Sequence, residues 1–435
     1  MKKNAIIVPV CSDYNRGDQA LVLETMNLIK IARKDIEDVY MMSNNETKQC
    51  EEFGIKQFEP ILKHPSRFTK KSSNIKYGIS LKIKWGVIAF FDFILSQLLL
   101  NKFTRTICMP FLKKGTKESM KIYKECDVCF VKGGGFMHDY TGGIIGLYTM
   151  YYQIYPIMLA QKLNKDVYIM PNSYGPFKGK KTAKLLNKVL DKCKYITARE
   201  GISASSSTNG LNRNIDLYPD LGFFLEEANL EETKKYLNDN FQLDITSGKY
   251  VAITVRPYRF YNYDNPEEKY INYKKVFVKF INLLNEKGYK PLLVVHTRAE
   301  NDHENDECCI NEIAQMINDS SKYTIIKDDS LNCKQIKSIY SFCDFVIGTR
   351  FHSVIFSMEK LIPVIAITYG GNKGDGIMKD IGIDNYAIKI GDLTYENLKE
   401  TFLELEQNKQ DVIKKIKNYL EYSKTKYEEL IDKIK

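Results

Sequence analysis

The sequence lacks several motifs that would identify a common class of enzyme. It contains no H-E-x-x-H, no P-loop and no G-x-S-x-G, so a zinc protease, a P-loop nucleotide hydrolase or a nucleophile-elbow hydrolase gains no support. It also lacks internal repeats and low-complexity tracts. Hydrophobic residues make up 44% of the chain, which is enough to close packed cores and excludes a collagenous, mucin-like or largely unfolded protein.

Cysteine is too sparse and too scattered to build a scaffold. The ten cysteines are spread through 435 residues instead of framing a small domain, so a reducing compartment is indicated. The apolar run near the N-terminus, from Ala5 to Val10, has six residues, which is shorter than a signal-peptide core. We interpret it as a first strand and expect a cytoplasmic protein.

The length predicts two domains, because single cores stop growing at roughly 250 to 300 residues. Short apolar runs alternate with helix-like patterns in both halves, as in buried parallel strands joined by helices. A polar, acidic stretch at residues 226–248 interrupts this alternation. The predicted fold class is α/β, with two Rossmann-like doubly wound domains facing a cleft and with terminal helices. The expected ranges are 1–240 and 249–405 for the domains and 406–435 for a C-terminal helix.

The strand candidates are short and mostly apolar. Because parallel sheets bind ligands at the carboxyl ends of their strands, the cleft between the domains is the expected site. Helices are expected to begin near Asp18, Gly143 and Lys180. Strands are expected at residues 5–10, 39–42, 128–131, 167–170, 250–255, 291–296, 323–326, 344–347, 363–367 and 386–390.

The net charge is concentrated in one insert. Residues 61–124 carry 14 Lys plus Arg against two acids, a local balance of 14 minus 2, or +12, whereas the whole chain has +10. The insert encloses Gly86–Leu100, a stretch that is too short and too interrupted for a transmembrane helix of about 20 residues. It is flanked by Trp85 and by the basic residues Lys82, Lys84, Lys102 and Arg105.

Three interpretations of this insert stay open. It could be a buried domain helix with a solvated basic border, a helix in the interface of an anionic membrane surface, or a contact for a protein partner. Nucleic acid is not expected as a partner, because no recognised nucleic-acid motif accompanies the basic residues.

The run from Cys343 to Ser353 carries the most chemical information. Its strand ends at Gly348 and delivers Arg350 and His352 to the carboxyl edge of the sheet, at the start of the next helix. Arginine binds a carboxylate or phosphate with a planar fork, and histidine transfers a proton near neutral pH. An anionic ligand is predicted, although a helix-start arginine with a structural histidine would give the same pattern.

Arg256 has a similar position to Arg350, because it lies at the end of the first strand of the second half. Pro257 stops that strand and leaves the arginine at the edge. Two arginines on one edge favour a small ligand with two anionic groups. A surface salt bridge is the alternative for Arg256.

In the first half, three glycines at residues 133–135 follow a strand and would let a ligand approach the backbone, unless they form a plain glycine turn. They are neither a Walker loop nor G-x-G-x-x-G, so no nucleotide site is predicted. Asp139 comes shortly after them, and Tyr174 begins a turn after the next strand. Asp18 lies at the start of the first helix, where an aspartate suits an N-cap as well as a catalytic acid or base.

Other candidates have simpler explanations. Cys126 and Cys129 have redox spacing but lie on a predicted buried strand without a second pair. Acidic residues from Glu300 to Glu307 could gather a cation, yet they also suit the dipole at a helix start. No metal site and no cofactor are predicted.

Taken together, these pieces resemble the polysaccharide pyruvyl transferase family, over residues 15 to about 385. The resemblance implies a fold similar to GT-B glycosyltransferases and transfer of a pyruvyl group from phosphoenolpyruvate to sugar hydroxyls as a ketal. The matching pieces are Asn15–Asp18, Gly133–Gly135, Tyr174–Phe177, Ala198–Glu200, Tyr218–Leu221, Arg256-Pro257, Gly348–Ser353 and Pro363-Val-Ile.

The chemistry of that reaction fits the candidate residues. We expect His352 to be the general acid, with Asp18 as a further catalytic residue, and Arg256, Arg350, Phe351 and Lys373 to bind the donor. The acceptor saccharide, lipid-linked or free, is expected against the first domain. The residues expected there are Gly134, Gly135, Asp139 and Tyr174, and either Asp18 or Asp139 would deprotonate the attacking hydroxyl.

Two other functions compete with this one. A GT-B nucleotide-sugar glycosyltransferase would share the architecture, and a non-catalytic, membrane-associated saccharide-assembly factor would use the basic insert. The resemblance implies an enzyme of exopolysaccharide biosynthesis. The +12 insert around an apolar helix concerns location instead, and we expect a cytoplasmic protein that is peripheral on the inner membrane face.

Overall fold

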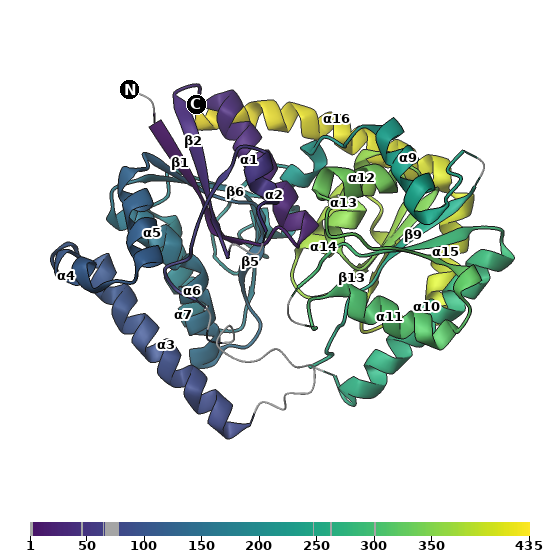
Figure 1. The fold of residues 1–435 in the computed structure, drawn as a ribbon, viewed down its shortest axis with the longest axis horizontal. Helices are drawn as coiled ribbons and strands as arrows, with labels where there is room; N and C mark the ends of the chain where they lie inside the picture. Colours follow the sequence, from purple (N-terminus) through teal and green to yellow (C-terminus); the bar gives the residue numbers. More distant parts are fainter. Residues whose placement is uncertain are drawn as a thin grey trace. The chain divides into compact units, whose positions relative to one another are not determined.

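The computed structural model describes residues 3–44, 47–63, 65, 78–246, 248–261, 263–299 and 302–435. The chain forms two compact units, each built on its own sheet (Figure 1). The first unit comprises Met1–Asp13, Leu21–Asp220 and Lys426–Lys435, and the second comprises Tyr14–Ala20 and Leu221–Thr425.

The division between the units differs from the expected domain boundary at residue 240. It falls at Asp220, twenty residues earlier, because two segments pack on helices of the second unit. The segment η3 (Leu221–Phe224) packs on α13 (Phe351–Glu359), and α9 (Leu230–Phe241) packs on α12 (Cys333–Tyr340). The segment Tyr14–Ala20 also belongs to the second unit. Asp18, a candidate residue expected in the first domain, therefore belongs to the second unit.

The described residues of the first unit form an eight-stranded sheet in the order β3-β2-β1-β4-β6-β7-β8, with β5 paired to β6. Every pairing is parallel. All four residues of β4 are buried, as expected of a continuous apolar run in a parallel sheet. The strands are β1 (Lys3–Cys11), β2 (Ile36–Ser43), β3 (Lys56–Phe58), β4 (Val128–Val131), β5 (Gly134–Asp139), β6 (Asp166–Phe177), β7 (Tyr195–Ala198) and β8 (Asp216–Leu217).

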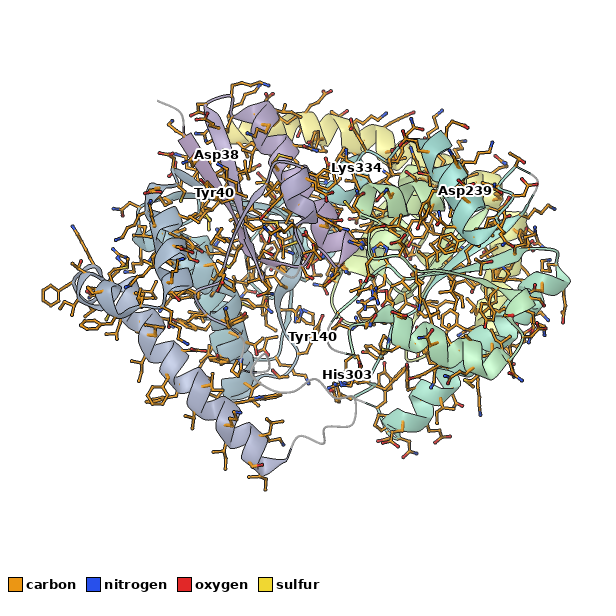
Figure 2. All side chains as sticks on the ribbon, viewed as in Figure 1. Asp38, Tyr40, Tyr140, Asp239, His303 and Lys334 are labelled. Carbon is orange, nitrogen blue, oxygen red and sulfur yellow. The ribbon has the colours of Figure 1, made fainter. Side chains whose placement is uncertain are left out.

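Helices cover this sheet, and α6 and α7 pack on each other and against β6 (Figure 1). Figure 2 labels Asp38 and Tyr40 on β2, which lies beside β1. The helical segments are α1 (Arg16–Ala32), α2 (Gln49–Glu52), α3 (Ile79–Leu100), α4 (Lys102–Cys108), η2 (Met109–Phe111), α5 (Lys114–Glu125), α6 (Gly143–Lys162), α7 (Lys180–Leu190) and α8 (Gly201–Ala204).

The described residues of the second unit form a six-stranded parallel sheet in the order β11-β10-β9-β12-β13-β14. The two central strands, β9 and β12, have all their residues buried. The strands are β9 (Tyr250–Thr254), β10 (Lys290–Val294), β11 (Thr324–Ile326), β12 (Phe345–Gly348), β13 (Val364–Thr368) and β14 (Ala387–Lys389).

Helices separate these strands in sequence, which makes each connection a βα crossover. Figure 2 labels Lys334 on α12 and Asp239 on α9, two helices that pack together. The remaining segments are α10 (Pro266–Glu286), α11 (Asp306–Ile317), η4 (Ser320–Lys322), α12 (Cys333–Tyr340), α13 (Phe351–Glu359), α14 (Lys373–Ile381), η5 (Asp384–Tyr386), α15 (Tyr395–Gln407) and α16 (Lys409–Ile434).

The predicted pattern of strands is confirmed to within three residues at most ends. The predicted strand at residues 5–10 is β1, and those at 250–255 and 363–367 are β9 and β13. Four strands, β3, β5, β7 and β8, are absent from the expected ranges. For β5, the residues read as a glycine loop or turn continue into a strand that pairs with β6. Glycine weakens any strand pattern because it has no side chain, so the residue pattern of β5 does not indicate a strand.

Helix α3 corrects the prediction for the basic insert. It begins at Ile79, seven residues before the expected apolar stretch, and its 22 residues are long and apolar enough to cross a membrane. Only Ser96, Leu99 and Leu100 of this helix are buried, so the buried-helix interpretation is wrong. Arg105, expected on the solvated border, is itself buried and donates to the Leu99 carbonyl oxygen (3.1 Å). Residues 64 and 66–77 of the insert lie outside the described residues.

Candidate functional site

The carboxyl edge of the second sheet brings Arg256 and Arg350 together. Strands β9 and β12 are neighbours with Gly348 opposite Thr254, and each arginine lies two residues beyond that pair. Both side chains reach Glu304, which comes from the loop before α11. Arg256 Nη2 is 3.0 Å from both carboxylate oxygens of Glu304, and Arg350 Nη1 is 3.4 Å from Oε2. Two arginines thus meet at one edge, as expected, around a carboxylate that the sequence did not assign to them.

Both guanidinium groups are held in place by further neighbours. Arg350 Nε donates to Asp306 Oδ1 (2.7 Å), and its Nη2 donates to the Glu304 carbonyl oxygen (2.7 Å). The Arg256 guanidinium lies 4.4 Å from the ring centroid of Tyr369. The side chain of Arg256 is 12% exposed and that of Glu304 is 52% exposed, so the salt bridge named as the alternative for Arg256 is present, with its carboxylate at the surface.

The charges in this group reinforce one another. Burial acts to lower the pKa of Arg350, but Asp306, Tyr369 and Glu304 outweigh it, so the guanidinium stays protonated. Burial acts to raise the pKa of Glu304, whereas Arg256 and Arg350 lower it below its ordinary value. The site therefore holds a carboxylate ion between two fixed cations.

The start of α1 lies against the start of α13. A Cβ atom placed on Gly17 would be 2.1 Å from Nδ1 of His352, so only glycine leaves room for this imidazole. Asn15 is the N-cap of α1, because its Oδ1 accepts from the backbone N–H groups of Gly17 (3.2 Å) and Asp18 (3.3 Å). The N-cap alternative for Asp18 is therefore wrong. Asp18 lies half-buried in the first turn of the helix.

The same segment is tied to the residues that follow β10, which include His296. The Arg16 N–H donates to the His296 carbonyl oxygen (3.3 Å), and Asn15 forms an isolated antiparallel bridge with Thr297. The sequence pattern Asn15–Asp18 thus places a helix start over the carboxyl edge of the second sheet. Of the residues expected to be catalytic, Asp18 and His352 both belong to this unit.

The remaining donor-side candidates lie at the starts of two helices. Phe351 and His352 open α13, and both are mostly buried. Lys373 opens α14, and its Nζ lies 5.9 Å from the ring centroid of Phe351. The structure therefore brings Arg256, Arg350, Phe351, His352 and Lys373 to the ends of three neighbouring strands, β9, β12 and β13.

His296 was missed by the sequence reasoning, which treated it only as the end of a strand. It is 2% exposed, and its Nδ1 lies 3.0 Å from the hydroxyl of Tyr340. Burial lowers its pKa well below the ordinary value, and the positive charges of His352, Arg350, Arg16 and Lys373 lower it further. A histidine two residues after a β strand, at the edge shared with Arg256, was the available signal.

The acceptor-side candidates belong to the first unit. Gly134 is buried at the start of β5, and Gly135 is exposed beside it. The Asp139 carboxylate accepts from the N–H groups of Gly142 (2.7 Å), Thr141 (3.1 Å) and Gly179 (3.2 Å) and from Thr182 Oγ1 (2.9 Å). Burial acts to raise the pKa of Asp139, but these hydrogen bonds lower it below the ordinary value, which makes the carboxylate a weak base.

Two aromatic residues of this unit differ in exposure. Tyr174 is fully buried, and its hydroxyl donates to the Thr197 carbonyl oxygen (3.0 Å), so its side chain is part of the core. Tyr140, which follows β5 and is labelled in Figure 2, is half-buried, and its ring lies 4.1 Å from that of His138. This pair is a feature of the first unit that the sequence reasoning did not select.

Two of the motif pieces in the first unit form one buried ion pair. Arg199 Nη1 donates to Asp220 Oδ2 (2.7 Å), with both side chains fully buried, and Arg199 Nε donates to Ser173 Oγ (2.8 Å). Breaking one partner of such a pair would leave an uncompensated buried charge. The buried ion pair therefore gives Ala198–Glu200 and Tyr218–Leu221 a structural role.

The described residues offer no group of three or more His, Cys, Asp or Glu side chains that could hold a metal ion. In the acidic run after residue 299, Glu304 and Asp306 pair with arginine and Glu307 lies in the first turn of α11, while residues 300 and 301 lie outside the described part of the chain. His303 of this run is labelled in Figure 2. Cys126 and Cys129 are both buried as free thiols.

Comparison with known proteins gives one family. The sequence profile of a family described as "Polysaccharide pyruvyl transferase" matches residues 15–371. The chain is also similar to the amylovoran biosynthesis protein AmsJ of Erwinia amylovora, with 24% identity over 388 residues that cover 87% of this chain and 86% of AmsJ.

Solved structures with a similar fold have much lower sequence identity. The Staphylococcus aureus MnaA structure with UDP has a TM-score of 0.55 at 13% identity, over 96% of this chain and 90% of that one. The UDP-GlcNAc 2-epimerase of Neisseria meningitidis has a TM-score of 0.51 at 10% identity, over 96% and 94%. This likeness shows the fold alone: two Rossmann-like domains of the GT-B-like class, as predicted.

Proposed function

We propose that this chain, which belongs to the polysaccharide pyruvyl transferase family, is a transferase that moves the pyruvyl group of phosphoenolpyruvate onto a saccharide as a ketal. The relative AmsJ supports a role in polysaccharide biosynthesis. The observation that carries the proposal is the carboxylate of Glu304 between Arg256 and Arg350. A group of this size and charge can be exchanged for the carboxylate of a small donor.

Phosphoenolpyruvate has the charges that this edge requires. Its carboxylate would replace that of Glu304 between the two guanidinium groups, which bind planar oxyanions well. Its phosphate would lie toward the start of α14, where Lys373 adds a positive charge. Phe351, whose ring is buried beside Lys373, would line the apolar side of the enol group.

The reaction needs a general acid of the protein that protonates the donor, and two hydroxyl groups on the acceptor. His352 would donate a proton to the methylene carbon, which becomes a methyl group and leaves a cationic carbon between the carboxylate and the phosphate. One sugar hydroxyl attacks this carbon and loses its proton. Phosphate then leaves with the C–O bond electrons, and a second hydroxyl attacks and loses its proton. Of the two hydroxyl protons, one replaces the proton given by His352 and the other leaves with phosphate.

Asp18 is our candidate for the base that removes a hydroxyl proton. It lies in the first turn of α1, the helix whose Gly17 contacts His352. Asp139 is less suited to this step because its hydrogen bonds lower its basicity. Gly134, Gly135 and Tyr174 stay as candidates for acceptor contacts, with Tyr174 limited to its backbone because the side chain is buried.

We propose that the protein binds its acceptor at a membrane surface. The described residues expose a row of large apolar side chains on α3, α4, η2 and the start of α6, which we call the α3–α4 surface. Exposed Lys82, Lys84, Lys102, Lys113 and Lys114 lie on or beside these helices and suit an anionic lipid surface. Its apolar residues are Ile79, Ile83, Val87, Phe90, Phe91, Phe93, Ile94, Phe103, Ile107, Phe111, Ile144 and Ile145. A lipid-linked saccharide on the cytoplasmic side is therefore the acceptor class we favour.

The transferase activity is tested by incubating the protein with phosphoenolpyruvate and a panel of lipid-linked saccharides. We expect phosphate release only when an acceptor is present, with loss of turnover in His352→Ala and weaker donor binding in Arg350→Ala. Wild-type rates in both variants would refute the assignments. The rival nucleotide-sugar glycosyltransferase predicts instead that UDP is released from a UDP-sugar and no phosphate from phosphoenolpyruvate.

The membrane contact is tested by flotation with liposomes of neutral or anionic lipid. We expect binding to anionic liposomes that falls as salt rises, and loss of binding in Phe90→Glu/Phe91→Glu. The matched control is Ile271→Glu/Met316→Glu, which adds the same two charges at exposed apolar positions of α10 and α11. Equal flotation of both double variants would contradict the proposed surface. Resistance to extraction by high salt and alkaline carbonate would indicate that α3 spans the bilayer.

A further inference from the structure

Hydrogen bonds at the start of α13 indicate which ring nitrogen of His296 carries the proton, because they bear on where its neighbour Tyr340 directs the hydroxyl proton. Arg350 N–H donates to Thr254 Oγ1 (3.3 Å), Thr254 Oγ1 lies 2.9 Å from Ser353 Oγ, and Ser353 Oγ donates to the Arg350 carbonyl oxygen (2.6 Å). Since the Ser353 proton is used for the carbonyl, the Thr254 hydroxyl is the donor in their shared bond. This ring of bonds around the start of α13 is complete without a proton from Tyr340.

The Tyr340 hydroxyl also has a side-chain hydrogen bond with Ser353, whose own bonds are complete without the phenol proton, so we assign that proton to the contact with His296. Burial raises the pKa of Tyr340 well above its ordinary value, so the phenol keeps its proton and can donate to Nδ1 of His296 at 3.0 Å. A neutral imidazole that accepts at Nδ1 carries its own proton at Nε2. His296 is neutral because burial and the neighbouring cations disfavour the charged form.

The Nε2–H group of His296 has no acceptor among the described residues, although it is buried. Leaving such a donor unsatisfied is unfavourable, and native proteins rarely do so without a ligand or water. The charged groups that act on this ring are His352, Arg350, Arg16 and Lys373, all cations or potential cations. A buried N–H donor among positive charges suits an oxygen atom of an anion.

We propose that His296 is a donor-binding residue that gives its Nε2–H to a phosphate oxygen of the enol phosphate, with Tyr340 fixing the tautomer. This inference rests on the proposed function for the identity of the donor. Phosphate is favoured over carboxylate because Arg256 and Arg350 already hold one carboxylate, that of Glu304, and the donor has one group of each kind. His296 would thus hold the leaving group while His352 protonates the carbon.

The first test measures binding of inorganic phosphate by calorimetry, which needs no turnover. His296→Asn keeps an acceptor near the position of Nδ1 but lacks the Nε2–H, and we expect about a tenfold weaker affinity. His296→Gln, whose amide reaches the position of Nε2, should recover part of the loss. His138→Asn, in the other unit, is the matched control and should bind as wild type does. Equal affinity in wild type and His296→Asn would overturn the inference, as would an equal loss of affinity for pyruvate, which has only the carboxylate.

The second test reads the tautomer by long-range 1H–15N NMR of the histidine rings, with His296 assigned by its substitution; the chain has five histidines. We expect the Nε2–H form in the free protein, a shift of Nε2 when phosphate is added, and a mixture of tautomers in Tyr340→Phe. An Nδ1–H tautomer in wild type would overturn the inference even if His296→Asn does not fold. If phosphate binding depends on His296 but phosphoenolpyruvate is never consumed, the anion site stands and the proposed reaction fails.

Discussion

Replacing Gly17 with alanine tests the contact between the first helix and the proposed general acid. The added Cβ would lie 2.1 Å from Nδ1 of His352, whereas ordinary contact begins near 3.4 Å. The imidazole or the helix start must therefore move by about 1.3 Å, which is 3.4 minus 2.1. A displacement of about 1 Å at a reacting group can lower the rate on the order of 100-fold, which corresponds to roughly 2.7 kcal/mol in the activation free energy.

The effect on stability should be much smaller than the effect on rate. Alanine favours a helix over glycine by up to about 1 kcal/mol, whereas crowding in a packed site costs roughly 1 to 3 kcal/mol. We therefore expect a net loss of about 0 to 2 kcal/mol in the free energy of unfolding, measured by urea denaturation. Phosphate release from phosphoenolpyruvate should fall by about two orders of magnitude in kcat.

The matched control is Gly86→Ala in α3, where an added Cβ would meet no atom within 4 Å. With a water-soluble acceptor, this variant should keep the wild-type rate. The reasoning would be refuted if Gly17→Ala turned over as fast as wild type. It would also be refuted if the loss of activity in Gly17→Ala matched a loss of folded protein.

Three further predictions concern other groups. Glu304→Gln removes the carboxylate ion that Arg256 and Arg350 share, so the KM for phosphoenolpyruvate should fall several-fold with little change in kcat, and a higher KM would contradict displacement of Glu304 by the donor. Asp139 has a lowered pKa in the folded protein, so its carboxylate stabilises the fold above its unfolded pKa of about 3.9 and loses this effect as the pH falls through the folded value. Asp139→Asn should therefore cost about 1 to 3 kcal/mol in urea unfolding at pH 7, with a smaller difference near pH 3; a constant difference would be inconsistent with this linkage. Burial raises the pKa of the Cys126 thiol to about 12 and that of the Cys129 thiol well above its ordinary value. Neither thiol should therefore react with iodoacetamide in the native protein at pH 8. Mass spectrometry should show that the half-buried Cys108 reacts first.

The α3–α4 surface shows where sequence patterns stop being sufficient. The apolar content of α3 was visible in the sequence, yet a buried helix and an exposed one have the same composition. The structure decides between them, because Phe90 is 60% and Phe91 63% exposed. The buried residues of the helix lie near its end, where Ser96 and Gln97 form hydrogen bonds with Tyr151. Whether an apolar face is covered depends on the rest of the fold, and no local pattern records it.

By itself the sequence determined the fold class and the positions of the arginines. Apolar runs separated by helical patterns require buried parallel strands, and Arg256 and Arg350 follow two such runs, so both must lie at the carboxyl edge of a sheet. These conclusions depend on neighbouring residues alone. They hold because periodicity and strand ends are local properties of the chain.

Only the tertiary structure decided what each of these groups contacts. Gly17 and His352 are 335 residues apart in sequence (352 minus 17), and nothing near either one shows that the glycine makes room for the imidazole. Glu304 became the shared partner of two arginines, and His296 became a buried side chain whose Nε2 has no partner among the described residues, through packing between distant segments. Such contacts are set by the register and packing of whole strands and helices, which a single sequence does not reveal.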